Sequence, residues 1–513
     1  MNSNKRDLTI LAQRNTCNYE QIRPYENLKE KGQFFTPVVI AKFMADQFDL
    51  STKNINILDP GAGTGILTAA ICNRIAEEST EEKVVNITAY EDDETVLPFL
   101  NNNLEEVQAR IEEIGHKLNY EINRNNFIYD NYLTLDSRDL FKGNPTTYNI
   151  IVSNPPYFKL NKSDKISQLM DEIVHGQPNI YMFFLAISSK LLSDNGQMVF
   201  ITPRSFCSGL YFRKFRKWLL DIVNLSSIHV FKSRNETFSN NVLQETIITK
   251  FEKNTKKDTV LISESNRSDL MSSVKFEVSK DIVVDPNDSE KVICIPKNEE
   301  DIKIIKIMRG MKNSFKDLGY KISTGPVVSF RNQENLIYND DFDKNNTVPL
   351  ILMNNLIDYS VVFPLTNFKK SQYLQLCEKT EKLILPNKNY VLVKRFSSKE
   401  QKKRIYASCY FSEQNDFPYV TFENHLNYIK NTKDSFSKIE ILGIMVYLNS
   451  TFVDNYFRTI NGNTQVNAKE IENLPFLGKD KILEIGKQVE KLNTSLNQET
   501  IDSIISKIMN FQN

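Results

Sequence analysis

The chain has few of the residues that usually build metal sites and disulfide frameworks. Six cysteines and four histidines are scattered over 513 residues, and they form no C-x-x-C or H-x₃-H pair. Structural zinc sites need such closely spaced ligands, so the sequence predicts no bound metal. Scattered cysteines without partners are typical of reduced thiols, and we therefore expect a cytoplasmic protein.

Long hydrophobic runs and a net charge are also missing. No apolar stretch approaches the roughly 18 residues that span a bilayer, and the start, Met1–Arg6, lacks the apolar segment of a signal peptide. We expect no membrane partner. Basic and acidic residues number 64 each, so overall charge neither favours nor excludes nucleic acid, and any basic surface must be local. The content of 40% hydrophobic and 25% charged residues is typical of a globular protein with two or three domains.

Short apolar runs alternate with amphipathic segments between about residues 38 and 250. This alternation predicts an α/β fold, a Rossmann-like, seven-stranded and mostly parallel sheet. The last two strands are separated by too few residues for a crossover helix, so the last strand should pair antiparallel. The expected strands are 55–58, 84–90, 127–129, 148–152, 198–202, 227–231 and 245–251. The expected helices are 38–48, 66–78, 94–114, 181–192 and 211–222.

The second half of the chain has a different character. A polar, turn-rich passage from 253 to about 289 is followed by irregular β runs, and helices return only late in the chain. This pattern predicts a separate α+β domain. The expected β runs are 347–353, 382–385 and 390–393, and the expected helices are 439–457 and 480–492. The expected division is an N-terminal extension (1–20), a first domain (21–252), a connecting segment (253–300), the α+β domain (301–475) and a C-terminal helical segment (476–513).

Polar signals follow the first three expected strands. A glycine loop, Asp59-Pro60-Gly61-Ala62-Gly63-Thr64-Gly65, leads from strand to helix, Glu91 ends the second strand and Asp130 ends the third. The loop has neither the dinucleotide spacing nor the lysine of a P-loop, and Glu91 stands where an acid binds ribose hydroxyls. Asp130 could accept a hydrogen bond from an adenine amino group. A plain turn and solvated acids are the alternatives, but their common place at strand ends favours an adenosine ligand without phosphates.

A fourth signal, Asn154-Pro155-Pro156-Tyr157, follows the strand expected at 148–152. Two consecutive prolines make the loop stiff. Asn154 Oδ1 and the Pro155 carbonyl can accept the protons of an amino group, and the Tyr157 ring can stack on the ring that bears it. A proline-rich turn with a packed tyrosine is the alternative. Downstream of the other three signals, the tetrapeptide predicts a catalytic loop for a planar amine.

These motifs resemble those of the S-adenosylmethionine-dependent DNA adenine-N6 methyltransferases of restriction-modification type. In the resembling group the cofactor motifs precede the catalytic motif, and a target recognition domain comes last. The resemblance implies that 21–252 is the catalytic domain and 301–475 the DNA target recognition domain. It also matches Gly32-Gln33-Phe34-Phe35-Thr36-Pro37 to a segment that holds the methionine part of the cofactor. The cofactor-binding residues implied are Phe35, Thr36, Asp59, Gly61, Gly63, Gly65, Glu91, Asp130 and Asn154, and the catalytic residues are Asn154, Pro155, Pro156 and Tyr157.

The resemblance further implies which aromatics stack on the target base. Tyr157 is the first candidate, and Phe231, in Val230-Phe231, matches the position of a second aromatic. Phe238 lies close enough in sequence to align instead. Packing in the core is an equal alternative for Phe231.

The chemistry implied is direct methyl transfer from S-adenosylmethionine to the N6 amino group of a flipped adenine in double-stranded DNA. An adenine amino nitrogen is a poor nucleophile because its lone pair is delocalised into the ring. Hydrogen bonds to Asn154 Oδ1 and the Pro155 carbonyl would free that lone pair, so positioning supplies the catalysis. No cysteine follows a proline, which argues against the thiolate chemistry of cytosine-C5 methylation. Removing the base from the duplex costs a few kcal/mol.

A basic run in the second half is a candidate phosphate-contacting stripe, with Phe396 and Tyr406 interleaved. A solvated basic face is the alternative. The polar amides of 462–467 could read base edges or cap turns. The DNA-binding residues expected in the run are Lys394, Arg395, Lys399, Lys402, Lys403 and Arg404.

Two other functions fit the same motifs. The tetrapeptide could serve a methyltransferase that acts on RNA or on a protein glutamine amide, although a C-terminal domain of about 220 residues favours DNA. The chain could instead be a catalytically silent DNA-binding specificity subunit, which the intact acids and Asn154 argue against. A companion restriction endonuclease would be a further partner, since no carboxylate-lysine nuclease pattern stands out in this chain.

Overall fold

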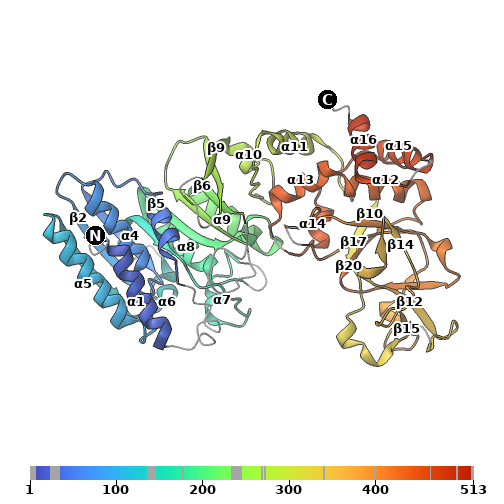
Figure 1. The fold of residues 1–513 in the computed structure, drawn as a ribbon, viewed down its shortest axis with the longest axis horizontal. Coiled ribbons are helices and arrows are strands. Elements are labelled where there is room, and N and C mark those ends of the chain that lie inside the picture. The colour runs from blue at the N-terminus through green and yellow to red at the C-terminus, as the bar shows by residue number, and fades with distance from the viewer. Residues whose placement is uncertain are drawn as a thin grey trace. The chain divides into compact units, whose positions relative to one another are not determined.

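The computed structural model describes residues 7–22, 35–135, 146–174, 178–232, 245–266, 270, 273–338, 341–397, 400–462, 464–492 and 495–509. The chain forms two compact units, Met1–Asn298 and Glu299–Asn513 (Figure 1). Within the described residues, no helix is both long and apolar enough to cross a membrane.

The first unit contains one nine-stranded sheet with the order β3-β2-β1-β4-β5-β7-β6-β8-β9. Strands β1 to β5 run parallel, and β7 pairs antiparallel with both β5 and β6. The mostly parallel α/β sheet and its antiparallel β7 are therefore confirmed. The strands are β1 (Asn54–Pro60), β2 (Val84–Tyr90), β3 (Lys117–Asn123), β4 (Tyr148–Ser153), β5 (Leu192–Pro203), β6 (Asn224–Phe231), β7 (Thr246–Glu252), β8 (Thr259–Ser265) and β9 (Val274–Ser279).

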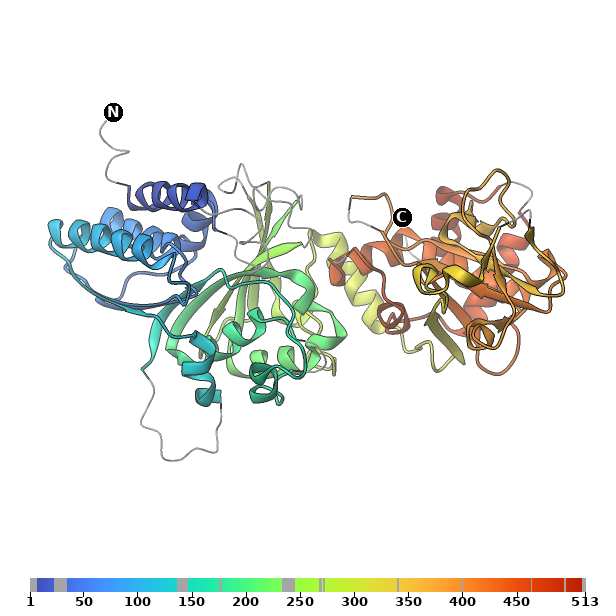
Figure 2. The same ribbon diagram turned by 90° about the horizontal axis from the view of Figure 1, so that it is seen from below.

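Helices cover both faces of this sheet. The blue helices of Figure 2 lie on one face and the green helices on the other. The central strands β1 and β4 are rich in Ile and Val because parallel strands are buried on both faces; Ile57, Ile151 and Val152 are completely buried. The helices on the first face are α1 (Leu8–Ile22), α3 (Val38–Ala45), α4 (Ile66–Glu78) and α5 (Leu97–Glu113), and those on the second are α8 (Tyr181–Leu191) and α9 (Arg213–Ile222).

The third strand lies elsewhere than the sequence predicted. Residues 127–129 belong to the short helix α6 (Phe127–Asn131), and β3 takes the place of the third strand at Lys117–Asn123. Asn126 caps α6, because its side-chain oxygen accepts a bond from the Ile128 N–H at 3.1 Å. The apolar run Phe-Ile-Tyr packs as a helical turn, so its β propensity was misleading.

The first unit is also longer than expected at both ends. Helix α1 lies in the segment predicted as an extension, and it packs against α4 and α5. Past residue 252, the predicted end of the first domain, β8 pairs parallel with β6, and β9 pairs antiparallel with β8. The predicted connecting segment therefore adds two strands to the sheet, and the expected number of seven strands is corrected to nine.

The second unit has two sheets and a group of helices, which confirms its α+β class. A six-stranded sheet has the order β10-β20-β17-β18-β14-β13, and a five-stranded sheet the order β11-β15-β12-β19-β16. Helix α12 packs against β17 and β18. The strands are β10 (Tyr320–Thr324), β11 (Leu336–Ile337), β12 (Thr347–Ile351), β13 (Leu356–Ile357), β14 (Ser360–Val361), β15 (Tyr373–Gln375), β16 (Leu385–Pro386), β17 (Tyr390–Lys394), β18 (Ala407–Tyr410), β19 (Tyr419–Phe422) and β20 (Leu426–Asn431).

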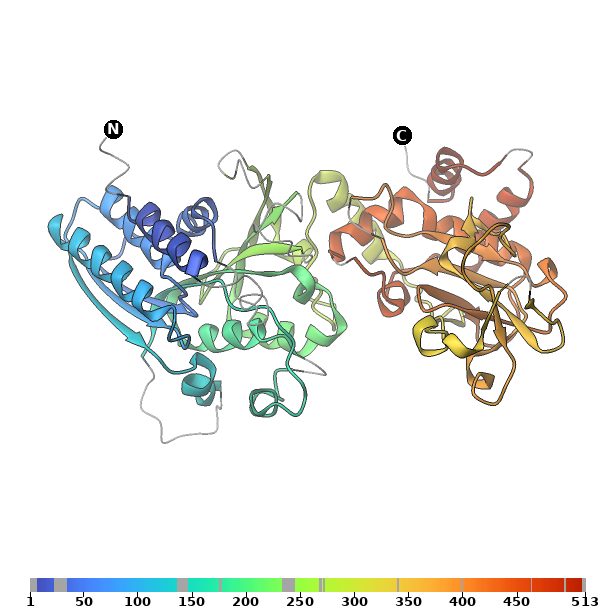
Figure 3. The ribbon, with the colours of Figure 1, turned by 60° about the horizontal axis from the view of Figure 1, so that its bottom comes forward.

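The late helices of the second unit gather beside these strands, as the orange and red ribbons of Figure 3 show. The single helix predicted at 439–457 is two helices, because Ser450 leaves the helical conformation and caps the next one by accepting from the Val453 N–H at 3.2 Å. The helices are α11 (Glu299–Gly310), α12 (Lys438–Asn449), α13 (Thr451–Ile460), α14 (Ala468–Glu472), α15 (Lys479–Glu490) and α16 (Gln498–Met509).

Candidate active site

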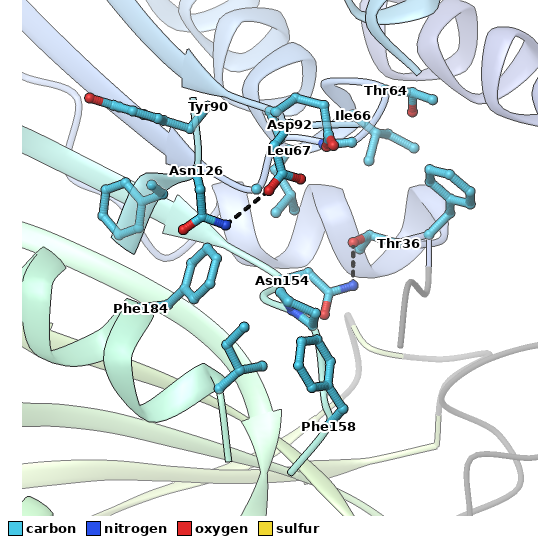
Figure 4. Close-up of a pocket in the computed structure, with 18 of the residues that line it drawn as sticks. Thr36, Thr64, Ile66, Leu67, Tyr90, Asp92, Asn126, Asn154, Phe158 and Phe184 are labelled. Atoms are coloured by element: carbon cyan, nitrogen blue, oxygen red, sulfur yellow. Dashed lines mark hydrogen bonds between the residues drawn. The ribbon is translucent and has the colours of Figure 1, made fainter. Parts of the chain in front are cut away.

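A cavity of about 750 Å³ opens at the carboxyl ends of β1, β2 and β4 (Figure 4). Its size is that of a site for a small organic ligand. Open α/β sheets bind their ligands at this edge, so the fold and the cavity point to the same place. The lining residues are Phe35, Thr36, Gly61, Ala62, Gly63, Thr64, Ile66, Leu67, Tyr90, Glu91, Asp92, Asn125, Asn126, Phe127, Asn154, Pro156, Phe158, Lys159, Ile180 and Phe184.

The glycine loop is fixed against the end of β2. Gly61, Gly63 and Gly65 have φ values of +71°, +57° and +83°, in the left-handed region that glycine tolerates best. The Ala62 N–H donates to the Tyr90 carbonyl at 2.8 Å, and the Gly63 N–H donates to Glu91 Oε2 at 2.8 Å. Glycine conformations and backbone bonds thus shape one wall of the cavity.

Two acids beside this loop are buried. Asp59 accepts from the Thr68 hydroxyl through Oδ2 at 2.7 Å, whereas no donor among the described residues reaches Asp59 Oδ1. Burial raises the pKa of Asp59 to about 7, and burial likewise raises the pKa of Glu91 to about 7 against the bonds from Gly63 and Asp93. Both carboxyl groups are held in surroundings that suit a ligand with donors or positive charge.

Asn154 faces the cavity with its amide group oriented by two neighbours. Its Nδ2 donates to the Thr36 hydroxyl at 3.1 Å, as the dashed line of Figure 4 shows. Its Oδ1 accepts from the Tyr157 hydroxyl at 2.7 Å. The first of these contacts joins the tetrapeptide to the segment ahead of α3. The structure therefore brings together two motifs that lie 118 residues apart.

The Tyr157 hydroxyl, which donates to Asn154 Oδ1, belongs to a residue outside the cavity lining. That hydroxyl also approaches the Ile201 carbonyl at 2.8 Å, and burial raises the pKa of Tyr157 well above its usual value. The ring packs against the core of the first unit but is only partly buried. Pro155 is buried beside it, while Pro156 lines the cavity.

Several lining residues were not predicted from the sequence. Tyr90, Phe127 and Phe184 form an aromatic wall, with ring centroids 5.2 Å apart for Tyr90 and Phe127 and 5.3 Å apart for Phe127 and Phe184. Asn126 lines the same side and donates to Asp92 Oδ2 at 2.9 Å. The alternating Leu118, Tyr120 and Ile122 of β3 were the signal that would have placed Asn126 at a strand end.

Six of the site residues predicted in the first unit are not among the residues that line the cavity: Asp59, Gly65, Asp130, Pro155, Tyr157 and Phe231. Asp130 is on α6, where its Oδ2 accepts from Asn123 at 3.2 Å and from Asn125 at 3.0 Å, so its predicted place at the end of a strand is wrong. Phe231 is almost completely buried and packs edge to face against His229 at 5.0 Å, which is the core role that the sequence left open. Phe238 lies outside the described residues.

The predicted basic stripe of the second unit is only partly a surface. Arg404 is completely buried, and its guanidinium donates to the Asn461 carbonyl and amide oxygens at 3.3 and 3.0 Å. Lys403 is half-buried and donates to the Asn449 carbonyl at 3.0 Å. Lys402 is exposed, and Lys399 lies outside the described residues. Burial removes Arg404 from any phosphate-contacting surface, which corrects the prediction for that residue.

Among the residues that the structure describes, no group of three or more histidines, cysteines or acids could hold a metal ion. The cavity does suit S-adenosylmethionine. It has a glycine wall for a closely approaching ligand, the buried acid Glu91 on the lining beside that wall, and the aromatic wall of Tyr90, Phe127 and Phe184.

Comparisons with known proteins identify the family. The Eco57I restriction-modification methylase family matches residues 62–238, which include the end of the glycine loop and the whole tetrapeptide. The type II methyltransferase M.BsuBI of Bacillus subtilis is 37% identical over 94% of this chain and 95% of its own length. The chain belongs to the type II DNA methyltransferases of restriction-modification systems. Another member, M.PstI of Providencia stuartii, is 35% identical over 94% of both chains.

The fold agrees with this membership. The solved structure of the type IIL restriction-modification enzyme MmeI in complex with DNA has a TM-score of 0.56 to this chain at 12% identity, covering 98% of this chain and 74% of MmeI. S-adenosylmethionine is the cofactor of this type II methyltransferase, as the sequence predicted.

Proposed function

We propose that this methyltransferase modifies the N6 amino group of a flipped adenine within a specific double-stranded DNA sequence. The orientation of the Asn154 amide carries the proposal. Asn154 Nδ2 donates to the Thr36 hydroxyl, so Oδ1 is the amide atom that would accept a hydrogen bond from a target amine. An amide oxygen can accept two hydrogen bonds. An adenine amino group donates, so it matches this acceptor.

The cofactor would be held by the glycine wall, the acids and the aromatics of the same cavity. Glu91 is the candidate for the ribose hydroxyls, and Phe35 and Thr36 for the methionine part. For the adenine ring we assign the aromatic wall of Phe127 and Phe184, with Asn126 at its edge in the place that the sequence gave to Asp130. When bound, the cofactor supplies an electrophilic methyl group.

The protein's own part in the reaction is positioning and hydrogen bonding. Asn154 Oδ1 and the Pro155 carbonyl each accept a hydrogen bond from one N–H of the amino group. These two bonds turn the nitrogen lone pair toward the methyl donor. Pro155 and Pro156 keep the loop from relaxing. The partly exposed face of the Tyr157 ring stacks on the flipped base, and Phe158, on the cavity wall, is a second aromatic within the same loop.

DNA is the favoured substrate over RNA or a protein amide. The type II methyltransferase M.BsuBI matches both units of the chain, so the second unit is part of the shared architecture and not an addition to it. We assign the second unit to DNA target recognition. A restriction endonuclease with the same target would be the companion protein.

Methyl transfer to mixed genomic DNA tests the proposal. The purified chain is incubated with labelled S-adenosylmethionine and double-stranded DNA, and the nucleosides are analysed by mass spectrometry. We expect N6-methyladenine at one sequence motif, located by sequencing of modified bases. N4-methylcytosine as the product, or labelled protein or RNA with unlabelled DNA, would overturn it.

Asn154→Ala tests the catalytic assignment. Removing the amide should lower the methylation rate by at least about a hundredfold, because the amino group loses its acceptor. The cofactor dissociation constant, measured by calorimetry, should stay within about threefold of wild type. A variant with near-normal turnover would contradict the role of Asn154.

A further inference from the structure

Four loops far apart in sequence meet at one end of the six-stranded sheet. They span residues 325–331, 394–397, 423–425 and 464–466. The Asn424 N–H donates to the Val327 carbonyl at 2.8 Å, which joins the first loop to the third. The Arg395 N–H donates to the His425 carbonyl at 2.9 Å, which joins the second loop to the third.

The fourth loop is tied in the same way. The Ser397 N–H donates to the Thr464 carbonyl at 3.0 Å, and the Val466 N–H donates to the Arg395 carbonyl at 2.7 Å. Asn427 on β20 completes the junction, since its Nδ2 donates to the Val466 carbonyl at 2.8 Å. These backbone bonds make one surface out of four separate connections.

Gly325 allows the first loop to approach the third. A Cβ atom at this position would lie 2.0 Å from the Glu423 carbonyl oxygen, closer than any real contact. Its N–H donates to the Leu426 carbonyl at 2.8 Å. The loops are therefore positioned by backbone contact, so their exposed side chains can contact a ligand.

Cationic and aromatic groups occupy this loop end. The Phe396 and His425 rings meet edge to face at 5.2 Å, and Phe396 is 37% exposed. The Arg395 guanidinium lies 5.8 Å from the Phe396 ring, and its buried Nε finds no acceptor among the described residues. Phe330 is 70% exposed, and its neighbour Arg331 is exposed beside it.

The charge of the loop end is complementary to DNA. Lys394, Arg395 and Arg331 are cationic, and the acid of the third loop, Glu423, is buried with its oxygens engaged by His425 Nδ1 at 3.3 Å and by the Met353 N–H. The Arg395 Nη1 donates to the Asn424 carbonyl at 3.1 Å, which holds the guanidinium at the loop end. A cationic guanidinium beside exposed aromatic rings suits the acceptors and apolar groups of base edges, with lysine and arginine for the phosphates.

We infer that this loop end reads the bases of the DNA target, with Arg395, Phe396 and His425 at its centre and Phe330 and Arg331 at its margin. The inference rests on the proposed function and deepens it by naming the residues that set sequence specificity. Of the predicted stripe, Lys394 and Arg395 belong to this surface.

The opposite end of the same sheet provides a matched control. A cavity of about 390 Å³ there is lined by four lysines, Lys321, Lys388, Lys430 and Lys433. Lys321 and Lys430 stand directly opposite each other on β10 and β20. Replacing them with Gln removes two cations from the second unit without touching the four loops.

The test measures discrimination between DNA sequences. Methylation kcat/KM is compared on a short duplex that contains the motif found for the wild-type enzyme and on duplexes with one base pair of that motif changed. For the Phe396→Ala/His425→Ala variant we expect discrimination to fall by about tenfold or more at one or more positions. Cofactor affinity should be unchanged. The control Lys321→Gln/Lys430→Gln should discriminate as the wild type does.

Phe330→Ala is a second variant, since removing a mostly exposed ring leaves the core intact. We expect it to lower discrimination as well. The inference would be overturned if both loop-end variants discriminated between sequences as the wild type does. It would also be overturned if only the lysine control lost discrimination. A wild-type enzyme that methylates no DNA would instead refute the proposed function, so the two failures can be told apart.

Discussion

Tyr157 has a second role besides stacking of its ring, and its hydroxyl carries that role. The sequence predicted a ring that stacks on the base, and a ring alone would make phenylalanine an adequate substitute. The hydroxyl, however, holds Asn154 Oδ1 at 2.7 Å and reaches the Ile201 carbonyl at 2.8 Å. An asparagine amide without this donor is freer to turn, so the hydroxyl is a positioning group.

We therefore predict a graded series at Tyr157. Tyr157→Phe should lower kcat by about tenfold, because the amide loses its orientation, and Tyr157→Ala should lower it further, because stacking is also lost. KM for DNA should change mainly in the alanine variant. Steady-state kinetics on a duplex with the methylation motif measure both constants. Equal activity of wild type and Tyr157→Phe would show that the hydroxyl has no positioning role.

Glu91 should make the cofactor-free protein pH-sensitive. Burial raises the pKa of Glu91 from 4.5 to about 7, so the folded state holds a proton that the unfolded state releases. Between these values the unfolded state binds fewer protons, and the free energy of unfolding falls as pH rises. Glu91→Gln cannot titrate. The Tm of Glu91→Gln minus the wild-type Tm should therefore increase as pH rises from 5 to 8. Thermal scans without cofactor measure both values.

The Glu91 prediction has an internal comparison. Asp59, with a pKa raised to about 7 chiefly by burial, remains in both proteins, and its contribution differs between them only through the loss of the Glu91 charge, which also raises that pKa. A constant difference in Tm between variant and wild type across this range would contradict the burial of an ionisable Glu91.

Sequence reasoning recovered the site where chemistry is tied to a fixed motif. Gly61, Glu91 and Asn154 all line the cavity, because each follows a strand whose position the apolar pattern marks clearly. Asn126 and Phe184 could not be found this way. Their place depends on how α6 and α8 pack over the sheet edge, and a single asparagine or phenylalanine has no motif of its own.

Among the elements, α1 connects most directly to the site. Its Thr16 hydroxyl lies 2.6 Å from the hydroxyl of Thr64, which lines the cavity. The Tyr19 ring meets the Phe35 ring edge to face at 5.5 Å. A segment predicted as an extension therefore supports the wall of the candidate cofactor cavity.

Two buried threonines of α1 form a matched pair for testing this contact. Thr16→Val should weaken cofactor binding several-fold and destabilise the fold by about 1 kcal/mol, because Thr64 loses its partner. Thr9→Val should be neutral or stabilising, since the buried Thr9 hydroxyl has no partner among the described residues. Calorimetry and thermal unfolding measure the two effects. Equal losses in both variants would show that helix packing, and not the Thr16–Thr64 bond, matters.

Element prediction succeeded where burial is uniform and failed where it is mixed. The strand at 84–90 was predicted with the right bounds, since Val85 and Ile87 alternate within a buried strand. The edge strand β3 has only Leu118 fully buried, so its signal is weak beside the apolar run at 127–129. The start of β8, at 259–262, was expected to be a short β run, but β9 was not predicted, and nothing local shows that either strand joins the first sheet.

The balanced charge of the whole molecule limits its attraction to DNA. With 64 basic and 64 acidic residues, long-range attraction is absent, and affinity must come from local contacts. We predict a slope of log affinity against log salt corresponding to about four phosphate contacts or fewer. Lys402→Gln, at an exposed cation, should reduce the slope by about one. Fluorescence titrations at several salt concentrations give the slopes.

Arg404 provides the contrast to Lys402. Because its guanidinium is buried and bonded to Asn461, Arg404→Met should lower the Tm of the protein while leaving the salt slope unchanged. A smaller slope for folded Arg404→Met would show that the arginine contacts phosphate after all.

The loop end of the second unit also has an evolutionary consequence. Its four loops are joined mainly through backbone N–H and C=O groups, so the junction requires few particular residues apart from Gly325. Tip residues such as Phe330 and Phe396 can mutate while the scaffold survives. Under the proposed roles, a few surface changes could give a lineage with this architecture a new target, and a companion nuclease would then have to change its own target to match.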